Sequence, residues 1–478
     1  MRRRHFLSVL VGGALAGCTT DESTSTDGST STVTPAAVPD IASISDRSDL
    51  PPADRSGRRY DVTTLDSLDR TLAVTLTETT ADPPVLSVAL SSGSNRPPLL
   101  TGSVENPTST TLEVDLGHLP TFSAIPNAVP EGGSRRDSLM LAPRAGHDRR
   151  RYAPPAERGA DGWWLRASAF ESPWVDTSVV TLEPNERVRF VYAIVGRQDG
   201  TGLKTGRYRF LGRDRVVTLV VWQTSAPGPD IDSRFVNPGL PSLPIDGETG
   251  WYHDTTPETA VYLEPASERV TLPGSVTYRL VNHGRSVLEA RWRLLKLVDG
   301  DWYDLTPARD SISWRELVPG AIERWGLSLS HGAGREVPTT VGRLGGGWYA
   351  FVTEVEPSAI VRTALLSVDA PPLTITPDDD RSVSRDGATV TVTARGEVDD
   401  EPATLTVTRH ERGDTRLIRE QVQRQAGLRN TLAFFEDGVE RVVLRTDADT
   451  VRDVLGRDQS LSIRVGGDAY RIEADVSE

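Results

Sequence analysis

The sequence of 478 residues contains almost no cysteine, since Cys18 is the only one. A single thiol excludes an intrachain disulfide framework, a cysteine-rich zinc site and an iron–sulfur cluster. The seven histidines never lie within five positions of one another, which excludes local zinc motifs of the His-Glu-x-x-His type. No Gly-x-Ser-x-Gly elbow, phosphate-binding loop or dinucleotide fingerprint after a strand is present. From local motifs we therefore predict no catalytic residue, no cofactor and no metal site.

Lysine is also nearly absent, and the charge balance is acidic. The chain has 53 basic and 67 acidic residues and a net charge of −14. Only Lys204 and Lys296 are lysines, so the other 51 basic residues are arginines. Nucleic-acid binding needs a basic surface, so we expect no nucleic acid among the partners. At roughly 100–200 residues per domain, the length predicts two to four domains.

The longest apolar run extends from Phe6 to Ala16, after Arg2, Arg3, Arg4 and His5. As a helix it would be about 16 Å long, half the thickness of the hydrocarbon core of a bilayer. The run therefore indicates a signal peptide over residues 1–17 and not a transmembrane span.

The signal peptide contains two motifs of known families. Arg3-Arg4-His5-Phe6-Leu7 resembles the twin-arginine export motif, in which Arg3, Arg4, Phe6 and Leu7 form the export signal. Leu15-Ala16-Gly17-Cys18 resembles a lipobox, which implies a lipid on Cys18 as the first mature residue. The resemblance implies a chain anchored to the membrane through that lipid, at the outer (extracytoplasmic) face. The alternative is a chance basic and apolar start with an unrelated cysteine.

The composition resembles that of secreted proteins of halophilic archaea, in which arginine exceeds lysine and acidic residues dominate. Acidic surfaces tolerate molar salt because the Debye length there is about 3 Å. The resemblance implies a haloarchaeal-type lipoprotein. A GC-rich genome that favours arginine codons is the alternative explanation.

Composition shifts divide the mature chain into a tether and three folded regions. Residues 18–59 begin with a Ser/Thr-rich stretch without aromatic residues, which predicts a disordered tether after the lipidated cysteine. Residues 60–225 and 259–370 contain short β-branched, alternating segments between Gly, Pro and Asn. Residues 226–258 are rich in proline and predict a linker, which Phe235 and Trp251 could hold against neighbouring elements.

The two strand-rich regions share four landmarks in the same order. They are an asparagine turn after a strand, an Asp-Gly-Trp hairpin, a Leu-x-Pro turn and a Gly-x-Tyr-x-Phe strand, which begin at residues 106, 161, 182 and 206 and again at 282, 299, 317 and 347. This order resembles the immunoglobulin-like modules of bacterial and archaeal surface lipoproteins. The resemblance implies a mainly β fold with two immunoglobulin-like β-sandwich domains in tandem.

The first copy differs from the second by a long insertion over residues 117–160. The insertion contains Arg135, Arg136 and the run Arg149-Arg150-Arg151 among Pro and Gly residues. Two interpretations remain open: a binding loop on a rigid sandwich, and a disordered surface insertion.

Residues 371–478 predict a small α+β domain, or a further β domain with a helical insert. Period-two strands are expected over 388–394 and 403–409, and a hairpin over 461–474. A helix is expected over Leu417–Leu428 with an interruption at Gly427, and a second over Asp447–Leu455, which an Asp caps and Gly456 closes. The acidic cluster of Asp378, Asp379, Asp380 and Asp386 favours a solvated turn over a calcium site.

Paired aromatic residues are the strongest candidates for a binding surface. Neighbours on a strand point to opposite faces, so each pair should place one ring in the core and one outside. The outer rings would form a stacking platform for sugars or protein side chains, or else pack against arginine stems. The candidates are Trp163, Trp164, Trp302, Tyr303, Trp348 and Tyr349.

These observations predict a lipid-anchored surface protein without catalytic activity, which binds a protein or glycan or serves as a structural part of the envelope. The alternative is an extracytoplasmic enzyme or solute-capture lipoprotein whose site is assembled from distant residues. The two-lobed solute receptors need alternating strands and helices, which the first 370 residues lack.

Overall fold

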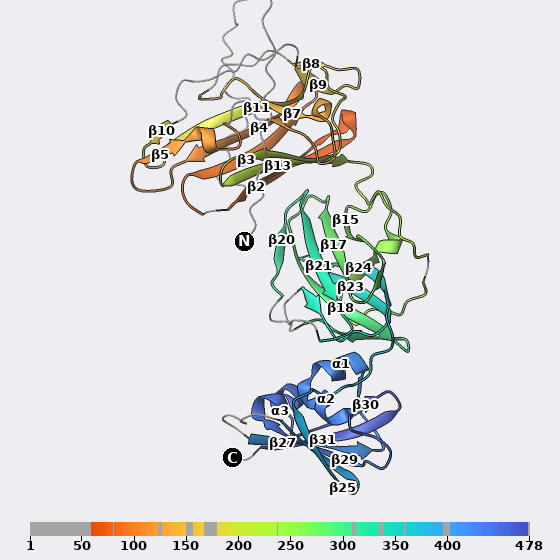
Figure 1. The fold of residues 1–478 in the computed structure, drawn as a ribbon. Helices are drawn as coiled ribbons and strands as arrows, with labels where there is room; N and C mark the ends of the chain where they lie inside the picture. The colour runs from red at the N-terminus through yellow and green to blue at the C-terminus, as the bar shows by residue number, and fades with distance from the viewer. Residues whose placement is uncertain are drawn as a thin grey trace, which may run out of the picture. The chain divides into compact units, whose positions relative to one another are not determined.

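A computed structural model describes residues 59–476 with internal gaps at 80, 123–126, 150–155, 167–178, 237, 308–311, 334–338, 358–359 and 395–401. The chain is mainly β, with 51% strand and 9% helix in several antiparallel sheets (Figure 1). The helices of these described residues are too short and too polar to cross a membrane.

In the first module two sheets enclose one core. A four-stranded sheet has the order β1 (Tyr60–Leu65), β2 (Arg70–Glu78), β13 (Arg215–Gln223) and β12 (Gly206–Leu211). The opposite sheet runs β3 (Val85–Gly93), β4 (Arg96–Glu105), β11 (Arg187–Gly196), β7 (Leu139–Pro143) and β6 (Asn127–Ala128), with β8 (Ala156–Arg158) and β9 (Trp164–Arg166) attached. Strands β5 (Leu112–Asp115) and β10 (Val179–Leu182) form a separate pair. Alternate residues such as Leu72, Val74 and Phe190 are fully buried, which explains the period-two pattern of these strands.

Part of the insertion predicted over residues 117–160 is core structure. Strand β7 pairs along β11, and all five of its residues are buried. His147 is also buried, and its Nε2 lies 2.8 Å from the hydroxyl oxygen of Tyr192. The prediction of a surface loop is therefore wrong for this part, because apolar Leu139, Met140 and Leu141 extend the sheet. Arg150 and Arg151 lie outside the described residues.

The second module repeats the arrangement of two facing sheets. One sheet has the order β15 (Val261–Pro265), β17 (Gly274–Asn282), β21 (Ile322–Leu329) and β22 (Thr340–Val341). The other runs β14 (Glu248–Trp251), β24 (Ile360–Asp369), β23 (Gly347–Glu356), β18 (Leu288–Val298) and β19 (Asp301–Asp304), with β16 (Arg269–Thr271) on β24 and β20 (Arg315–Leu317) on β18. Tyr278 and Phe351 come from opposite sheets and stack in the core with ring centroids 3.9 Å apart.

The repeated asparagine makes equivalent bonds in both modules. Asn106 is fully buried, and its Nδ2 donates to the carbonyl oxygens of Thr110 and Leu182 at 2.8 and 2.9 Å. Asn282 is buried likewise, and its Nδ2 donates to those of Ser286 and Leu317 at 2.9 and 2.8 Å. In each module one carboxamide therefore ties the end of a strand to the leucine of the Leu-x-Pro turn.

The Gly-x-Tyr landmark is also equivalent in the two modules. Gly206 and Gly347 have φ angles of 134° and 137°, a region that disfavours other residues. The hydroxyl of Tyr208 donates to the carbonyl of Lys204 at 2.8 Å, and that of Tyr349 donates to the carbonyl of Gly345 at 2.6 Å. The shared landmarks thus encode the same hydrogen bonds.

The third module is a seven-stranded mixed sheet with three short helices. Its strands have the order β25 (Arg381–Asp386), β26 (Thr389–Ala394), β29 (Arg441–Asp447), β27 (Pro402–His410), β31 (Asp468–Val476), β30 (Ser460–Val465) and β28 (Thr415–Leu417). The helices are α1 (Arg419–Arg424), α2 (Ala426–Leu432) and α3 (Ala448–Leu455). Of the two folds left open by the sequence, this one is α+β.

Helix α3 begins and ends at its predicted caps, whereas the helix predicted over Leu417–Leu428 differs from the structure. The Asp447 side chain accepts from the Thr450 N–H, and Gly456 follows the last turn of α3. The predicted helix over Leu417–Leu428 is two helices, and the break lies at Gln425, which has extended backbone angles. Gly427 lies inside α2, where a Cβ would approach Val454 to 2.7 Å. Close packing, not a helix end, therefore explains this glycine.

Candidate binding surfaces

The residues predicted to direct export and anchoring lie outside the described residues. These are Arg3, Arg4, Phe6, Leu7 and Cys18. The six aromatic candidates are all described.

Each aromatic pair places its two rings on opposite sides of a sheet. Trp163, Tyr303 and Tyr349 belong to the cores between the sheets. Trp164 and Trp302 belong to separate apolar clusters on the outer faces, and Trp348 is 41% exposed. The rings therefore alternate as the strand period requires, but they do not form one continuous platform.

The outer face of the second module is covered by residues 233–236 and 238–245, which we call the strap. Leu243 is buried with Trp302 in one apolar cluster, and Phe235, Leu240, Ile245 and Trp251 pack against it. The indole N–H of Trp302 donates to the carbonyl of Pro241 at 3.0 Å. The expectation that Trp302 faces a ligand is wrong, because apolar side chains of the linker occupy the face instead.

The beginning of the strap is held by a carboxylate and a phenol of the same module. Glu268 accepts from the Ser233 hydroxyl at 2.5 Å and from the Arg234 N–H at 2.7 Å. The Tyr252 hydroxyl donates to the carbonyl of Ile231 at 2.6 Å. Burial is the main cause that raises the pKa of Tyr252, to about 12, so the phenol stays a neutral donor. The proline-rich segment is therefore an ordered part of the module.

Only a small part of the predicted aromatic surface is exposed, around Trp348. Phe235 contacts Trp348 edge to face with ring centroids 5.3 Å apart, and the Arg234 guanidinium lies 4.9 Å from the Phe235 ring. The adjacent Val236 is 82% exposed. These residues can stack one sugar ring or contact one partner side chain.

The other predicted surface aromatics pack against arginine, as the alternative interpretation expects. The Arg158 guanidinium lies 5.0 Å from the ring of half-buried Trp164. The Arg416 guanidinium lies 5.9 Å from the ring of Tyr303, which is buried. Burial raises the pKa of Tyr303, and the positive charge of Arg416 opposes the shift.

An open pocket of about 240 Å³ lies at the end of β11 and β9 in the first module. It is lined by Arg166, Arg197, Gln198 and Asp199. Burial, followed by the neighbouring charge of Arg197, lowers the pKa of Arg166. Asp199 accepts from the Nε of Arg197 at 2.9 Å.

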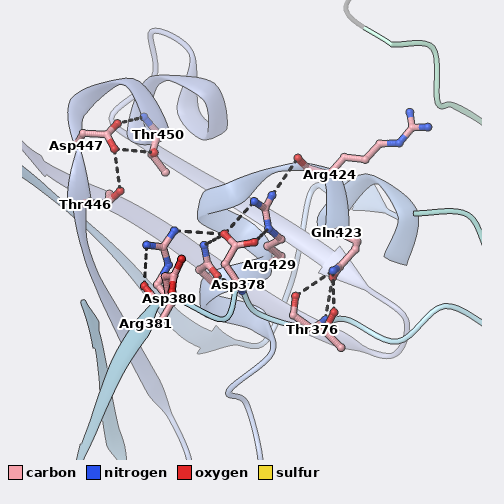
Figure 2. A network of polar contacts seen from close by, with 11 residues as sticks. Thr376, Asp378, Asp380, Arg381, Gln423, Arg424, Arg429, Thr446, Asp447 and Thr450 are labelled. Carbon is pink, nitrogen blue, oxygen red and sulfur yellow. Dashed lines mark hydrogen bonds and ion pairs between the residues drawn. The ribbon is translucent and has the colours of Figure 1, made fainter. Parts of the chain in front are cut away.

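One member of the acidic cluster, Asp378, belongs to a structural ion-pair network, as Figure 2 shows. Asp378 accepts from Nε and Nη2 of Arg429 at 2.7 and 2.9 Å and from Asn430 at 2.8 Å. Arg381 approaches the same carboxylate at 3.3 Å. Partial burial alone would raise the pKa of Asp378. The hydrogen bonds from Arg429 and Asn430 and the charge of Arg429 outweigh this effect, so the pKa of Asp378 lies below its ordinary value. Asp378 is therefore half-buried and paired, in contrast to the predicted solvated turn, whereas Asp379, Asp380 and Asp386 are exposed as that prediction expects.

We expect Asp378→Asn to destabilise the protein by about 2 kcal/mol at pH 7, because a charge-assisted pair with Arg429 is lost. The pKa of Asp378 is lower in the folded chain than in the unfolded chain, so its ionised form stabilises the fold. This contribution is fully present above the ordinary carboxylate pKa near 4, and it is lost as the pH falls through the pKa of the folded chain. The variant should therefore lose less stability than the native chain between pH 5 and pH 2, roughly the window of that titration. Urea unfolding across this range measures both effects. Asp379→Asn, at an exposed neighbour, is the control, and equal behaviour of the two variants would contradict the prediction.

The sequence matches no family model and no curated protein. Solved structures match with low similarity. The DNA glycosylase AlkC of Pseudomonas fluorescens is 12% identical with a TM-score of 0.16, over 23% of this chain and 31% of that one. A polysaccharide lyase is 10% identical with a TM-score of 0.13, over 62% and 39%. Domains FN1–FN3 of chicken CNTN1 are 7% identical with a TM-score of 0.12, over 82% and 92%.

The chain spans less than half the length of the first two of these structures. Their TM-scores lie far below the value that would indicate a common arrangement of the whole chain, so their activities carry no argument here. Only the geometry of the chain itself therefore bears on its function.

Proposed function

We propose that this chain is a haloarchaeal-type lipoprotein, exported by the twin-arginine route and anchored through Cys18. Its two facing-sheet modules are immunoglobulin-like sandwiches. Its function is non-catalytic: it presents a binding surface for a protein or glycan outside the cell, or it is a structural part of the envelope.

The observation that carries the proposal is the duplication of the facing-sheet module. The buried carboxamides of Asn106 and Asn282 and the bonded hydroxyls of Tyr208 and Tyr349 brace equivalent positions in both copies. Rigid tandem sandwiches suit the display of surfaces at a distance from an anchor. The signal-peptide and lipobox motifs support the location, and exposed Trp348 beside Phe235 supports a contact role.

Cell fractionation of a Cys18→Ser variant tests the anchor. We expect the native chain in the membrane fraction and the variant in the soluble extracytoplasmic fraction or unprocessed, because only a lipidated cysteine supplies the buried acyl chains. Replacing Arg3 and Arg4 with lysine should separately retain the chain inside the cell. Ser8→Ala, within the signal peptide but outside both motifs, is the matched control. Unchanged membrane retention of the Cys18→Ser variant would contradict the anchor.

A further inference from the structure

The sheet of the third module has one face covered by helices and one face without them. Val422 of α1, Leu428 of α2 and Val451 of α3 all pack in one core with Leu405 and Val442 of the sheet. All three helices therefore lie on the face to which Leu405 and Val442 point. Among the described residues no helix packs on the opposite face, which we call the open face.

Strand register defines the side chains of the open face. Thr406 follows Leu405 on β27 and therefore points away from the helices, to the open face. Thr406 pairs with Val443 and Glu473, and Val443 pairs with Thr391, so these residues also lie on the open face. Its hydroxyl residues are Ser382, Ser384, Thr389, Thr391, Thr393, Thr404, Thr406, Thr408, Ser460 and Ser462. Its charged residues with described side chains are Arg416, Arg441, Arg445, Arg464, Arg471, Asp386 and Glu473. Hydroxyls and guanidiniums therefore dominate this face.

The open face carries positive charge on an acidic protein. Arg471 bonds Glu473 with 2.8 Å between Nε and Oε1. Arg441, Arg445 and Arg464 are exposed and form no ion pair with a described carboxylate. Exposed guanidiniums without carboxylate partners stay available for an external anion.

The charges lie at regular intervals on a rigid surface. Arg441 and Arg445 are four residues apart on β29, which corresponds to about 13 Å along a strand. Arg441 and Arg471 both pair with Thr408 from opposite sides. Two strand spacings therefore separate them, about 10 Å across the sheet. Such spacing suits a ligand with repeated anionic groups.

The chemistry of the face distinguishes among anionic partners. No Phe, Tyr or Trp stands at its described positions, so it offers no ring on which nucleic-acid bases could stack. Its one large apolar residue, half-buried Val443, is too little for the apolar centre of a protein interface or for insertion into lipid. Hydroxyl rows between guanidiniums instead match a hydrated polymer that carries both hydroxyl and acidic groups.

We propose that the open face binds an anionic polysaccharide, with Arg441 and Arg445 pairing with its carboxylate or sulfate groups and the threonine rows bonding its hydroxyls. This partner class deepens the proposed function, because it rests on a chain exposed outside the cell. The fractionation test above concerns only location, so either proposal can fail without the other.

Binding of the purified, full-length Cys18→Ser chain to immobilised polysaccharides tests the site. Polygalacturonate supplies carboxylates, dextran sulfate supplies sulfates, and dextran is the neutral control. We expect binding to at least one polyanion in 0.1 M NaCl and its loss in 1 M NaCl, where the Debye length falls from about 10 to about 3 Å. No binding to dextran is expected.

The Arg441→Glu/Arg445→Glu variant should weaken that binding roughly tenfold or more, because repulsion replaces two charge-assisted contacts. Arg209→Glu/Arg213→Glu makes the same charge change at exposed positions of the first module and is the matched control. An unchanged unfolding midpoint verifies that the variant folds, and Arg464→Glu is a second, single change on the same face. Equal losses in the variant and its control would overturn the proposal. Binding to phosphatidylglycerol vesicles without binding to either polyanion would also overturn it.

Discussion

Lys296→Met should destabilise the protein by about 3–5 kcal/mol, because it leaves the carboxylate of Glu420 buried without a countercharge. Lys296 on β18 forms an ion pair with Glu420 on α1, and their side chains are only 8% and 5% exposed. Glu420 also accepts from the Gly345 N–H at 3.1 Å, and the ammonium of Lys296 lies 5.2 Å from the ring centroid of Tyr349. Water therefore cannot replace the lost lysine easily.

A double-mutant cycle separates the loss of the pair from the loss of packing. Glu420→Gln alone should destabilise the protein by a similar amount, because it leaves the ammonium of Lys296 buried without a countercharge. Lys296→Met/Glu420→Gln should recover most of the loss, since no charge stays buried and the glutamine oxygen still accepts from Gly345. Scanning calorimetry of the two single variants and the double variant measures the three losses of stability. Strictly additive losses would show that the two side chains do not form a buried pair.

Asn282→Ala should destabilise the second module by about 3 kcal/mol, because it leaves buried carbonyls without donors. The carboxamide donates to Ser286 and Leu317, and its Oδ1 accepts from the Gly284 N–H at 3.0 Å. Alanine can replace none of these bonds. The midpoint of the second module's transition in chemical unfolding, followed by tryptophan fluorescence, measures the effect.

The duplicated landmark provides an internal comparison. Asn106→Ala should destabilise the first module by a similar amount, because its carboxamide makes the corresponding bonds. Asn95→Ala, in an exposed turn, is the control and should change the free energy of unfolding by less than about 0.5 kcal/mol. A strong effect at Asn282 together with none at Asn106 would show that the two asparagines are not equivalent.

Local patterns predict the strands well, because alternation is a direct consequence of burial on one face. The short alternating segments predicted within residues 60–225 include β2, β3 and β11. The order of landmarks is informative for the same reason, since each depends on a backbone requirement such as the positive φ of Gly206 and Gly347. The break between α1 and α2 lies at Gln425, whereas the close packing of Gly427 against Val454 depends on tertiary contacts that no local pattern contains.

The aromatic candidates show where the prediction of a site reaches its limit. Strand alternation indicates which ring of a pair points outward, but it cannot show what covers that ring. The sequence indicated this cover only in part: Phe235 and Trp251 were expected to hold the linker against neighbouring elements, and both pack on the cluster of Trp302. The missed signal is the further apolar residues Leu240, Leu243 and Ile245 in a segment that would otherwise be solvated. The arginines of the open face were missed because Arg441 and Arg471 become neighbours only through the pairing of β29, β27 and β31.

The strap changes where the chain can be divided. A proline-rich segment is the usual place to separate two domains, and its composition sets the start of the second domain at Thr259. A fragment that begins there would expose the apolar row of Leu295, Trp302 and Val352 to water, together with the unbonded Trp302 N–H. We therefore expect the smallest soluble form of this module to begin before Ser233, because the strap covers its outer face and does not act as a spacer.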